Sequence, residues 1–438
     1  MDLLAATPLD EQKIQEIRAR HPSFTGKLPP QAKFWREADL DAFFGSSGEV
    51  LPQDGGRVAD DLSSCALLAR LRGKLAEAKI DAATAEHRSF CRHIRERAED
   101  VRQLPGAAAC AEVPRQARAP ELLKAPVLVE RVRMWVGRRW NAAFWRREMG
   151  GAGWKCRARA PAFEGDLASH ADALAEVCTA AEYVDYVHVL QQQDPLCEED
   201  KGLAYPRVTF YDWPAFSLGA KALFDNSWRE LAPPGVTDYS LRWLRRWSAV
   251  CRDMPAMDQF ARMHRVTIAA AGTVSRLHVE NYSAHVWLTQ IEGSRMFFLF
   301  PPQARGLYEE SGGGVVDPET VHAYTSKASP VDIFFPNRKR HPLFADAKAQ
   351  VAVLNPGESL VVPSGWWQHS VALEMSVTLH HAFWNVTNRG GVVDAVRDLV
   401  VGERQHSPET MEQAQRCLDE FYELVMDDDD PEDAEFSD

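Results

Sequence analysis

Two stretches of the chain carry the apolar and polar pattern of buried β-strands. The first, SRLHVENYSAHVWLTQIEGSRMFFLFPP at 275–302, alternates at its start and then becomes almost continuously apolar. The second, LVVPSGWWQHSVALEMSVTLHHAFW at 360–384, follows a turn signal, NPG, at 355–357. Short apolar runs bounded by turn residues are typical of strands. The pattern predicts that the middle of the chain is mainly β.

Helical spacing occurs on both sides of this β region. Two segments between residues 58 and 104 show it, and so does the chain after Ser407, a good N-cap that is followed by Pro408 at the first helical position. The apolar stripes consist of Leu67, Leu71 and Leu75, then Phe90, Ile94 and Val101, and finally Met411, Ala414, Leu418, Phe421 and Val425. The last stripe either packs on the β region or forms a homodimer interface, and the sequence does not decide between these.

Candidate chemistry lies in the two β stretches. His278 and Glu280 are two positions apart, so on a strand their side chains point to the same side and can converge on one metal ion. His369 in the second stretch is the candidate third ligand. Two histidines and one carboxylate on one face are typical of non-haem Fe(II) oxygenases. The alternative is a half-buried strand with an ordinary hydrogen-bonded histidine.

These residues resemble the JmjC or cupin-like 2-oxoglutarate oxygenases, and their protein-hydroxylase branch in particular. The likeness runs from LHVENYSAHVWLTQIEGSRMFFLFPP to GESLVVPSGWWQHSVALEMSVTLHHAFW, and covers about residues 116–390. It implies a mainly β fold, a double-stranded β-helix (jelly-roll) barrel with an N-terminal helical extension and C-terminal helices. The expected divisions are an extension at 1–115, the oxygenase domain at 116–390, helices at 391–426 and an acidic disordered tail at 427–438.

The resemblance also assigns roles to single residues. It implies that His278 and Glu280 bind Fe(II), and that Arg295 and Ser275 bind the distal carboxylate of 2-oxoglutarate. Arginine is chemically suited to this, because its guanidinium is always charged and binds a carboxylate through two parallel bonds. The segment at 303–345, between the two metal-bearing stretches, is expected to be a lid or a substrate-binding loop.

The chain departs from the family pattern at the third metal ligand. The family histidine directly follows the two tryptophans, but here that place is Gln368 and His369 comes one residue later. A shift of one residue turns a side chain to the opposite face of a strand, so we expect a β-bulge to bring His369 inward, with Gln368 as an uncertain ligand. Leu288 and Ala382 stand where relatives often carry cosubstrate-binding asparagine.

The leading hypothesis is therefore an Fe(II)- and 2-oxoglutarate-dependent dioxygenase that hydroxylates, or N-demethylates, a protein or peptide side chain. A second is a catalytically inactive JmjC-like binding or scaffold protein. A third keeps the chemistry but changes the substrate to a small molecule or a nucleic acid. The orientation of His369 and Gln368 relative to His278 and Glu280 separates the first two hypotheses.

Composition and charge indicate the class of protein and its cellular location. The 438 residues are 45% hydrophobic and 26% charged, as in an ordinary globular protein. The net charge is −13, but eight acidic residues lie between Asp427 and Asp438, so the body carries only −13 + 8 = −5. Eight scattered cysteines predict reduced thiols and an intracellular, cytoplasmic or nuclear location. We find no signal peptide and no apolar run that would span a membrane.

Two segments interleave arginine with tryptophan, at 130–150 and 241–250. Such patches can bind nucleic acid. Tryptophans are nevertheless usually buried, with arginine stems lying over them, and we favour that interpretation. Nucleic acid is therefore not an expected partner.

Overall fold

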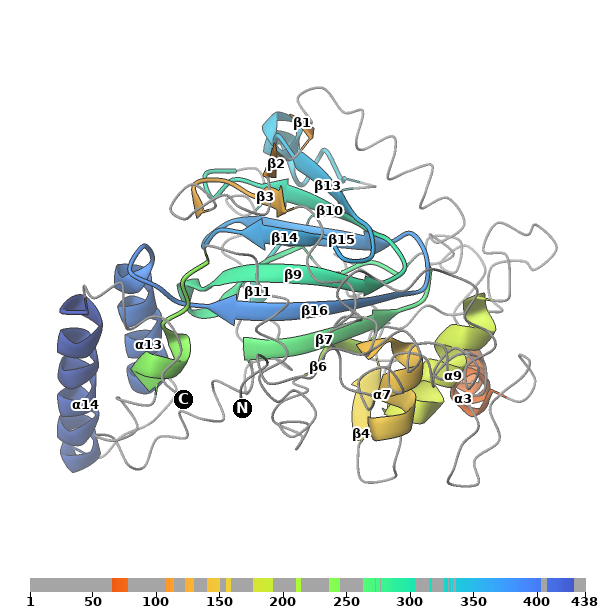
Figure 1. Cartoon of the computed structure of the whole chain (residues 1–438), viewed down its shortest axis with the longest axis horizontal. Coiled ribbons are helices and arrows are strands. Elements are labelled where there is room, and N and C mark those ends of the chain that lie inside the picture. The colour runs from red at the N-terminus through yellow and green to blue at the C-terminus, as the bar shows by residue number, and fades with distance from the viewer. Residues whose placement is uncertain are drawn as a thin grey trace, which may run out of the picture.

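Two facing β-sheets form the centre of the protein in a computed structural model (Figure 1). The structure describes residues 65–77, 108–109, 111–113, 123–129, 140–149, 155–158, 176–191, 210–213, 236–244, 263–271, 273–275, 277–304, 307, 315–316, 327–329, 331, 333, 336–402 and 408–428. The predicted helix with Phe90, Ile94 and Val101 lies outside these residues.

Each sheet has seven strands in the described part of the chain. The first consists, in spatial order, of β1 (Ala108–Ala109), β13 (Gln350–Leu354), β10 (Arg295–Phe300), β15 (Trp367–Ala372), β8 (His278–Val279), β12 (Lys327–Ala328) and β11 (Val315–Val316). The second consists of β2 (Ala111–Val113), β3 (Val127–Val129), β14 (Ser359–Val362), β9 (His285–Glu292), β16 (Ser376–Phe383), β7 (His264–Ala269) and β6 (Phe210–Trp213). A separate pair joins β4 (Lys155–Ala158) to β5 (Glu176–Thr179).

The predicted mainly β, jelly-roll architecture is confirmed. Most neighbouring strands are antiparallel, and β9, β10, β15 and β16 occupy the two predicted β stretches. The two sheets are not joined into a closed barrel by the strands that the structure describes. The strands β1 and β2 lie before residue 116 and pair in parallel with β13 and β3, so both sheets begin ahead of the expected domain boundary.

An apolar cluster fills the space between the sheets. We call it the inner cluster: Val286, Leu288, Phe297, Leu299, Ala352, Leu354, Leu360 and Val362. Its members alternate along β9, β10, β13 and β14, as the period-2 geometry of strands requires. The faces that carry this cluster are the inner faces of the two sheets, and they define which side chains can meet at a common site.

A second cluster covers the other side of the first sheet. This outer cluster includes Phe298, Trp367, Val371, Leu307 and Val331, together with other apolar residues. The short helix η11 (Pro342–Asp346) adds Phe344 to it. Leu307, Val331 and Phe344 belong to the segment predicted as a lid or substrate loop. These three residues pack on the back of the first sheet, and β11 and β12 of the same segment are strands at its edge.

The C-terminal helices form one side of the molecule (Figure 1). They are α13 (Arg389–Gly402) and α14 (Pro408–Met426), and α14 begins at the predicted proline. Leu418, Phe421 and Val425 are buried against α13 and against Tyr239, Trp243 and Trp384. The last stripe therefore packs on the body of the protein, while dimerisation stays a prediction.

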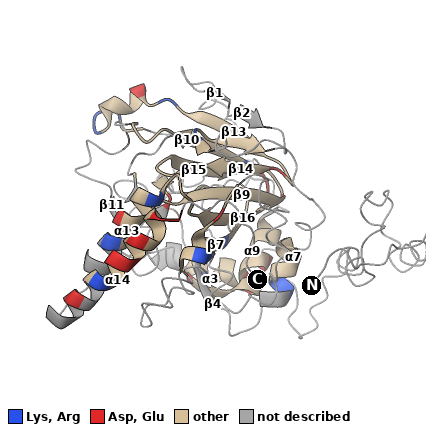
Figure 2. Ribbon diagram, turned by 60° about the vertical axis from the view of Figure 1, so that its left-hand side comes forward, with Lys and Arg blue, Asp and Glu red and all other residues tan. Residues whose placement is uncertain are grey.

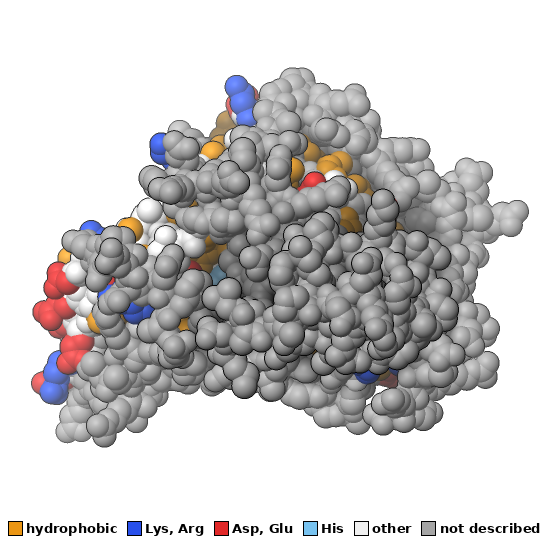
Figure 3. Space-filling model, in the orientation of Figure 1, with side chains coloured by type: hydrophobic (Ala, Val, Ile, Leu, Met, Phe, Trp, Pro, Cys, Tyr) orange, Lys and Arg blue, Asp and Glu red, His pale blue; other side chains and the backbone are white. Residues whose placement is uncertain are grey.

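The outward face of α14 is charged, as Figures 2 and 3 show. Beyond the helix, the side chain of Asp428 is buried, forms an ion pair with Arg242 (2.9 Å) and accepts a hydrogen bond from the Trp243 indole (2.8 Å). Asp428 lies at the start of the stretch expected to be a disordered tail, and residues 429–438 lie outside the described part.

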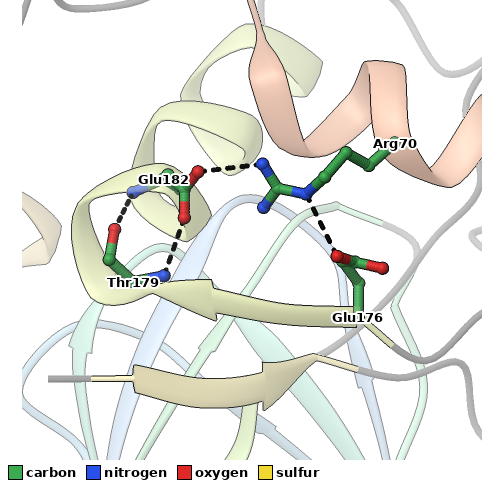
Figure 4. Close-up of polar contacts among 4 residues, drawn as sticks. All are labelled: Arg70, Glu176, Thr179 and Glu182. Atoms are coloured by element: carbon green, nitrogen blue, oxygen red, sulfur yellow. Dashed lines mark hydrogen bonds and ion pairs between the residues drawn. The ribbon is translucent and has the colours of Figure 1, made fainter. Parts of the chain in front are cut away.

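Three further helices pack together at the opposite end of the strands (Figure 1). They are α3 (Ala66–Glu77), α7 (Ala142–Met149) and α9 (Ala180–Gln191). A capping box starts α9, because Thr179 and Glu182 each bind the other's backbone N–H through their side chains, at 3.1 and 2.9 Å (Figure 4). Arg70 of α3 bridges Glu182 and Glu176, which ties α3 to β5 and α9.

The tryptophan and cysteine predictions have mixed outcomes. Trp140, Trp145 and Trp243 are buried, as expected. Cys65 and Cys178 are free, but Cys417 is disulfide-bonded, so the expectation of reduced thiols is wrong at that position. In the described residues, no helix is long and apolar enough to span a membrane.

One glycine controls how the β9–β10 turn meets the β15–β16 turn. Gly293 has a φ of +64°, a conformation that glycine adopts most readily. A Cβ atom there would lie 1.9 Å from the Met375 carbonyl oxygen. The Leu373 N–H donates to the Ser294 carbonyl at 2.9 Å across the same contact. The two turns therefore touch through backbone atoms.

Candidate functional site

His278 and Gln368 face each other between the sheets. In the antiparallel pairing of β8 with β15, His278 lies directly opposite Gln368, and Gln368 lies opposite Leu299 on β10. Residues directly opposite one another share a face. Leu299 belongs to the inner cluster, so His278 and Gln368 both project from the inner face.

Glu280 is the centre of a buried polar network. Its Oε1 accepts a hydrogen bond from Nη2 of Arg265 at 2.5 Å, and its Oε2 accepts one from Nε2 of Gln368 at 3.2 Å. The Arg265 and Glu280 side chains are only 3% and 5% exposed. Both carboxylate oxygens are thus engaged by N–H donors, one of them charged, which is the stronger kind of hydrogen bond.

The turn after Glu280 is conformationally special. Tyr282 and Ser283 both have a φ of +50°, in the left-handed region that side chains other than glycine adopt only rarely. The side-chain amide of Asn388, at the start of α13, donates to the Ser283 carbonyl at 2.7 Å. This contact helps to hold the reversal that carries the chain from Glu280 into β9.

His369 lies on the opposite face of β15. It pairs with Phe298, and its neighbours Trp367 and Val371 belong, like Phe298, to the outer cluster. The register between β10 and β15 runs without a shift from Arg295 to Phe300, so the β-bulge expected to turn His369 inward is absent. Burial, and then the charges of His278 and Arg295, lower the pKa of His369 to about 3.

The structure therefore brings Gln368, and not His369, to the pair formed by His278 and Glu280. The physical reason is the period of the strand: with no extra residue in β15, positions 367, 369 and 371 share the outer face. The role of any of these residues in binding a metal remains a prediction.

The two predicted cosubstrate residues lie on the two sides of β15. Arg295 is 1% exposed and pairs with Leu354 of the inner cluster, so it starts from the inner face. The Ser275 hydroxyl accepts a hydrogen bond from the backbone N–H of Ser370 at 2.7 Å. Ser275 is thereby fixed against β15, and its own hydroxyl hydrogen can still be donated. Binding of 2-oxoglutarate by either residue is also still a prediction.

Two inner-face residues complete the site. Arg265 and His380 are paired between β7 and β16, and His380 is also opposite Leu288 of the inner cluster. Burial, followed by the charges of Arg265, Arg295 and His278, lowers the pKa of His380 well below its usual value, so its imidazole is neutral. Its Nε2 has no hydrogen-bond partner in the described part of the chain.

Neither the contact of Arg265 nor the direction of His380 is predicted by the spacing of polar residues in the sequence. A signal for Arg265 exists, because it is the one residue with a permanent positive charge in HRVTIA, a strand buried at all six positions. His381, the neighbour of His380, projects outward, where its Nε2 lies 2.7 Å from Oδ2 of Asp238. Of the two positions where relatives carry asparagine, Leu288 belongs to the inner cluster and Ala382 packs among residues of the C-terminal helices.

Comparison with known proteins places these residues in a family. Residues 242–389 match a family model described as a cupin-like domain. Relatives include HSPB1-associated protein 1 of Rattus norvegicus (27% identical, 33% of this chain, 30% of that protein) and lysine-specific demethylase 8 of Xenopus tropicalis (29%, 26% and 23%). Arginine-specific demethylase JMJ20 of Arabidopsis thaliana is 25% identical over 36% of this chain and 30% of that protein. This part of the chain resembles the cupin-like domains of JmjC-type proteins.

The match covers only part of each protein. The aligned stretches span less than a third of the length of each of these relatives, between 23% and 30%. The residues that match the family model, 242–389, contain β7 to β16. What the relatives' names say of their activities belongs to those proteins.

The residues on the inner face do not fit the iron centre that this family implies. The inner face offers the imidazoles of His278 from β8 and His380 from β16, one carboxylate and one neutral amide, while His369, the expected third ligand, is on the far side of β15. The carboxylate is already paired with a guanidinium. In the part of the chain that the structure describes, no group of three or more His, Cys, Asp or Glu side chains is placed to hold a metal ion.

Proposed function

We propose that this chain is a JmjC-type binding protein whose cupin-like domain does not act as an iron-dependent oxygenase. The observation that carries the proposal is the position of Gln368, which stands opposite His278 and donates to Glu280 while His369 faces away. An amide is a weaker ligand for a first-row transition metal than imidazole, and carbonyl oxygens suit harder cations.

The electrostatics of the inner face support the same proposal. Arg265 keeps its charge at all accessible pH values and lies within hydrogen-bonding distance of Glu280. A divalent cation on this carboxylate would have to displace the guanidinium or bind beside it in a buried, poorly screened place. Either route weakens metal binding relative to a site with a free carboxylate.

The proposed partner is a protein, in an intracellular, cytoplasmic or nuclear setting. One relative is named for association with another protein, and two are named for demethylation of lysine or arginine. The protein-binding part of the proposal rests on that similarity. The interior of the domain would then serve to hold the two sheets in a fixed geometry.

The test is metal and 2-oxoglutarate binding by the purified full chain. Ligands that bind the folded state raise the melting temperature by mass action. We expect no shift with Mn²⁺ and 2-oxoglutarate together, and no succinate from iron-loaded protein given peptide pools. A shift that is present in the natural protein and abolished in H278A would refute the proposal.

A second candidate is an Fe(II)- and 2-oxoglutarate-dependent dioxygenase that hydroxylates or N-demethylates a protein side chain. It is favoured by the shared inner face of His278, Glu280 and Arg295 and by the demethylase relatives. In that case Arg295 and Ser275 would bind the cosubstrate carboxylate. Succinate formation that is lost in both H278A and R295A would establish it, and R242A, which alters an arginine outside the sheets, is the matched control.

A further inference from the structure

In the described part of the chain, Arg265 is an inner-face residue in direct contact with Glu280 that neither the sequence pattern nor the family likeness brought forward. It projects from β7, pairs across the sheet with His380, and reaches Glu280 at 2.5 Å. Its side chain is 3% exposed, so the guanidinium has left water almost entirely. A buried charge requires a partner, and Glu280 is that partner.

The position of Arg265 is fixed by its strand. β7 lies between β16 and β6, and its six residues are all buried. The Tyr183 hydroxyl of α9 donates to the Ile268 carbonyl at 2.7 Å, which ties the same strand to the helices outside the sheet. Arg265 therefore reaches Glu280 from a rigid element rather than from a loop.

We infer that Arg265 takes the electrostatic place of a metal ion at this site: it supplies the positive charge beside Glu280, and Gln368 completes the contacts of that carboxylate. The inference rests on the proposed function and adds a residue with a defined role. It has a direct consequence. Two changes, and not one, separate this chain from a metal-binding site, namely an imidazole at position 368 and removal of the charge at position 265.

The experiment is a Co²⁺ titration of the full chain, followed by visible absorption and by melting temperature. The proteins are the natural chain, Q368H, R265Q, and the double variant Q368H/R265Q. Replacing a partner of a metal ligand typically changes affinity 10- to 100-fold. We expect no binding by the natural chain or R265Q, weak binding by Q368H, and binding at least about 10-fold tighter by the double variant.

Matched controls separate the effect of the positive charge at position 265 from a general disturbance of the fold. Q368H/R265K keeps a positive charge at 265 and is expected to bind as weakly as Q368H. Q368H/R242Q removes a half-buried arginine, which pairs with Asp428 outside the sheets, and is expected to leave Co²⁺ affinity unchanged. Q368H/H369Q removes the outward imidazole and should also leave it unchanged.

The outcomes are distinct. If Q368H alone binds Co²⁺ as tightly as Q368H/R265Q, Arg265 does not stand in for a metal, although the proposed function survives. If the natural chain binds Co²⁺ through His278, the proposed function itself fails. Should the double variant not fold, R265L/Q368H repeats the charge removal. Folding of either one only with Co²⁺ supports the inference, and failure of both with Co²⁺ overturns it.

Discussion

Strands β15 and β16 each carry two neighbouring polar residues, of which the first faces inward and the second outward. In β15 the amide of Gln368 faces inward and the imidazole of His369 outward. In β16 the imidazole of His380 faces inward, and His381 faces outward to Asp238. Several histidines are thus buried near the centre of the fold, but only those on the inner face can contribute to the site.

The comparison teaches that the face of the strand, and not distance along the chain, decides what a residue can do. His369 is next to the residue that touches Glu280, yet its ring packs near Phe298, with 6.3 Å between ring centroids. His380 is about a hundred residues from Glu280 along the chain, and it pairs with the arginine that holds that carboxylate. Four changes test this division between inner and outer faces.

The largest effect is expected from the inner face, on removal of Glu280. E280A leaves the Arg265 guanidinium buried without its carboxylate, and breaking one side of a buried ion pair costs about 3–5 kcal/mol of unfolding free energy. Urea denaturation measures this loss. D394A removes an exposed pair with Arg397 and should change the free energy by less than about 0.5 kcal/mol. A loss in E280A as small as that in D394A would show that the inner network is not a stabilising unit.

An outer-face histidine should give the chain a pH dependence. His285 accepts a hydrogen bond at Nδ1 from the Ser364 N–H at 2.9 Å, and burial lowers its pKa to about 4 from 6.5. Because the unfolded chain binds this proton more readily, the stabilisation is complete above pH 6.5 and is lost as the pH falls toward 4. Between pH 7 and pH 5 the loss is about 2 kcal/mol.

The measurement compares free energies of unfolding of the natural chain and H285Q at these two pH values. The variant should be less stable at pH 7 and should lose less on acidification. Equal losses in the two proteins would mean that other groups carry the pH dependence.

A smaller effect is expected at the outward partner of His381. Asp238 accepts from His381 through one oxygen and from the Ser240 N–H through the other, at 2.7 and 2.8 Å. D238A removes both contacts and should cost about 1–2 kcal/mol. D238N keeps the contact to Ser240 and should cost about half as much. Thermal unfolding of the two variants separates the contributions, and identical losses would assign the whole effect to the imidazole.

The smallest effect is expected at the outward histidine of β15. H369L replaces a neutral ring in an apolar cluster by an apolar side chain of similar size, and such exchanges usually cost less than about 1.5 kcal/mol. We expect the response to Co²⁺ of Q368H to be the same with and without H369L. A change in metal affinity on this substitution would show that His369 reaches the inner face in solution, and would remove the contrast between the two strands.

The sequence was sufficient for the architecture, because period-2 patterning and turn residues are local signals. They placed β9, β10, β15 and β16, and the Ser-Pro start placed α14. The same periodicity placed His278 and Glu280 on one side of the chain. The face of His369 could not be decided in advance, since it depends on whether β15 contains a bulge, and that is set by pairing with β10 and β8.

Arg265 escaped prediction for a different reason. Its role comes from the contact of Arg265, on β7, with Glu280, directly after β8. The two residues are fifteen positions apart in sequence, but β7 and β8 belong to different sheets, and no spacing rule links them. A charged residue in a wholly buried strand was the available clue. The cysteine expectation failed at Cys417 because chain spacing carries no information on which thiols meet.

The backbone contact at Gly293 has a consequence for sequence change. Because the Met375 carbonyl occupies the place of a side chain, any other residue at 293 would force the two turns apart, and with them the ends of β10 and β15 next to Arg295. The arrangement of the strand ends beside Arg295 therefore depends on Gly293, a position that bears no functional group. Replacing this single hydrogen atom by a side chain would therefore shift the strands from which the polar residues project.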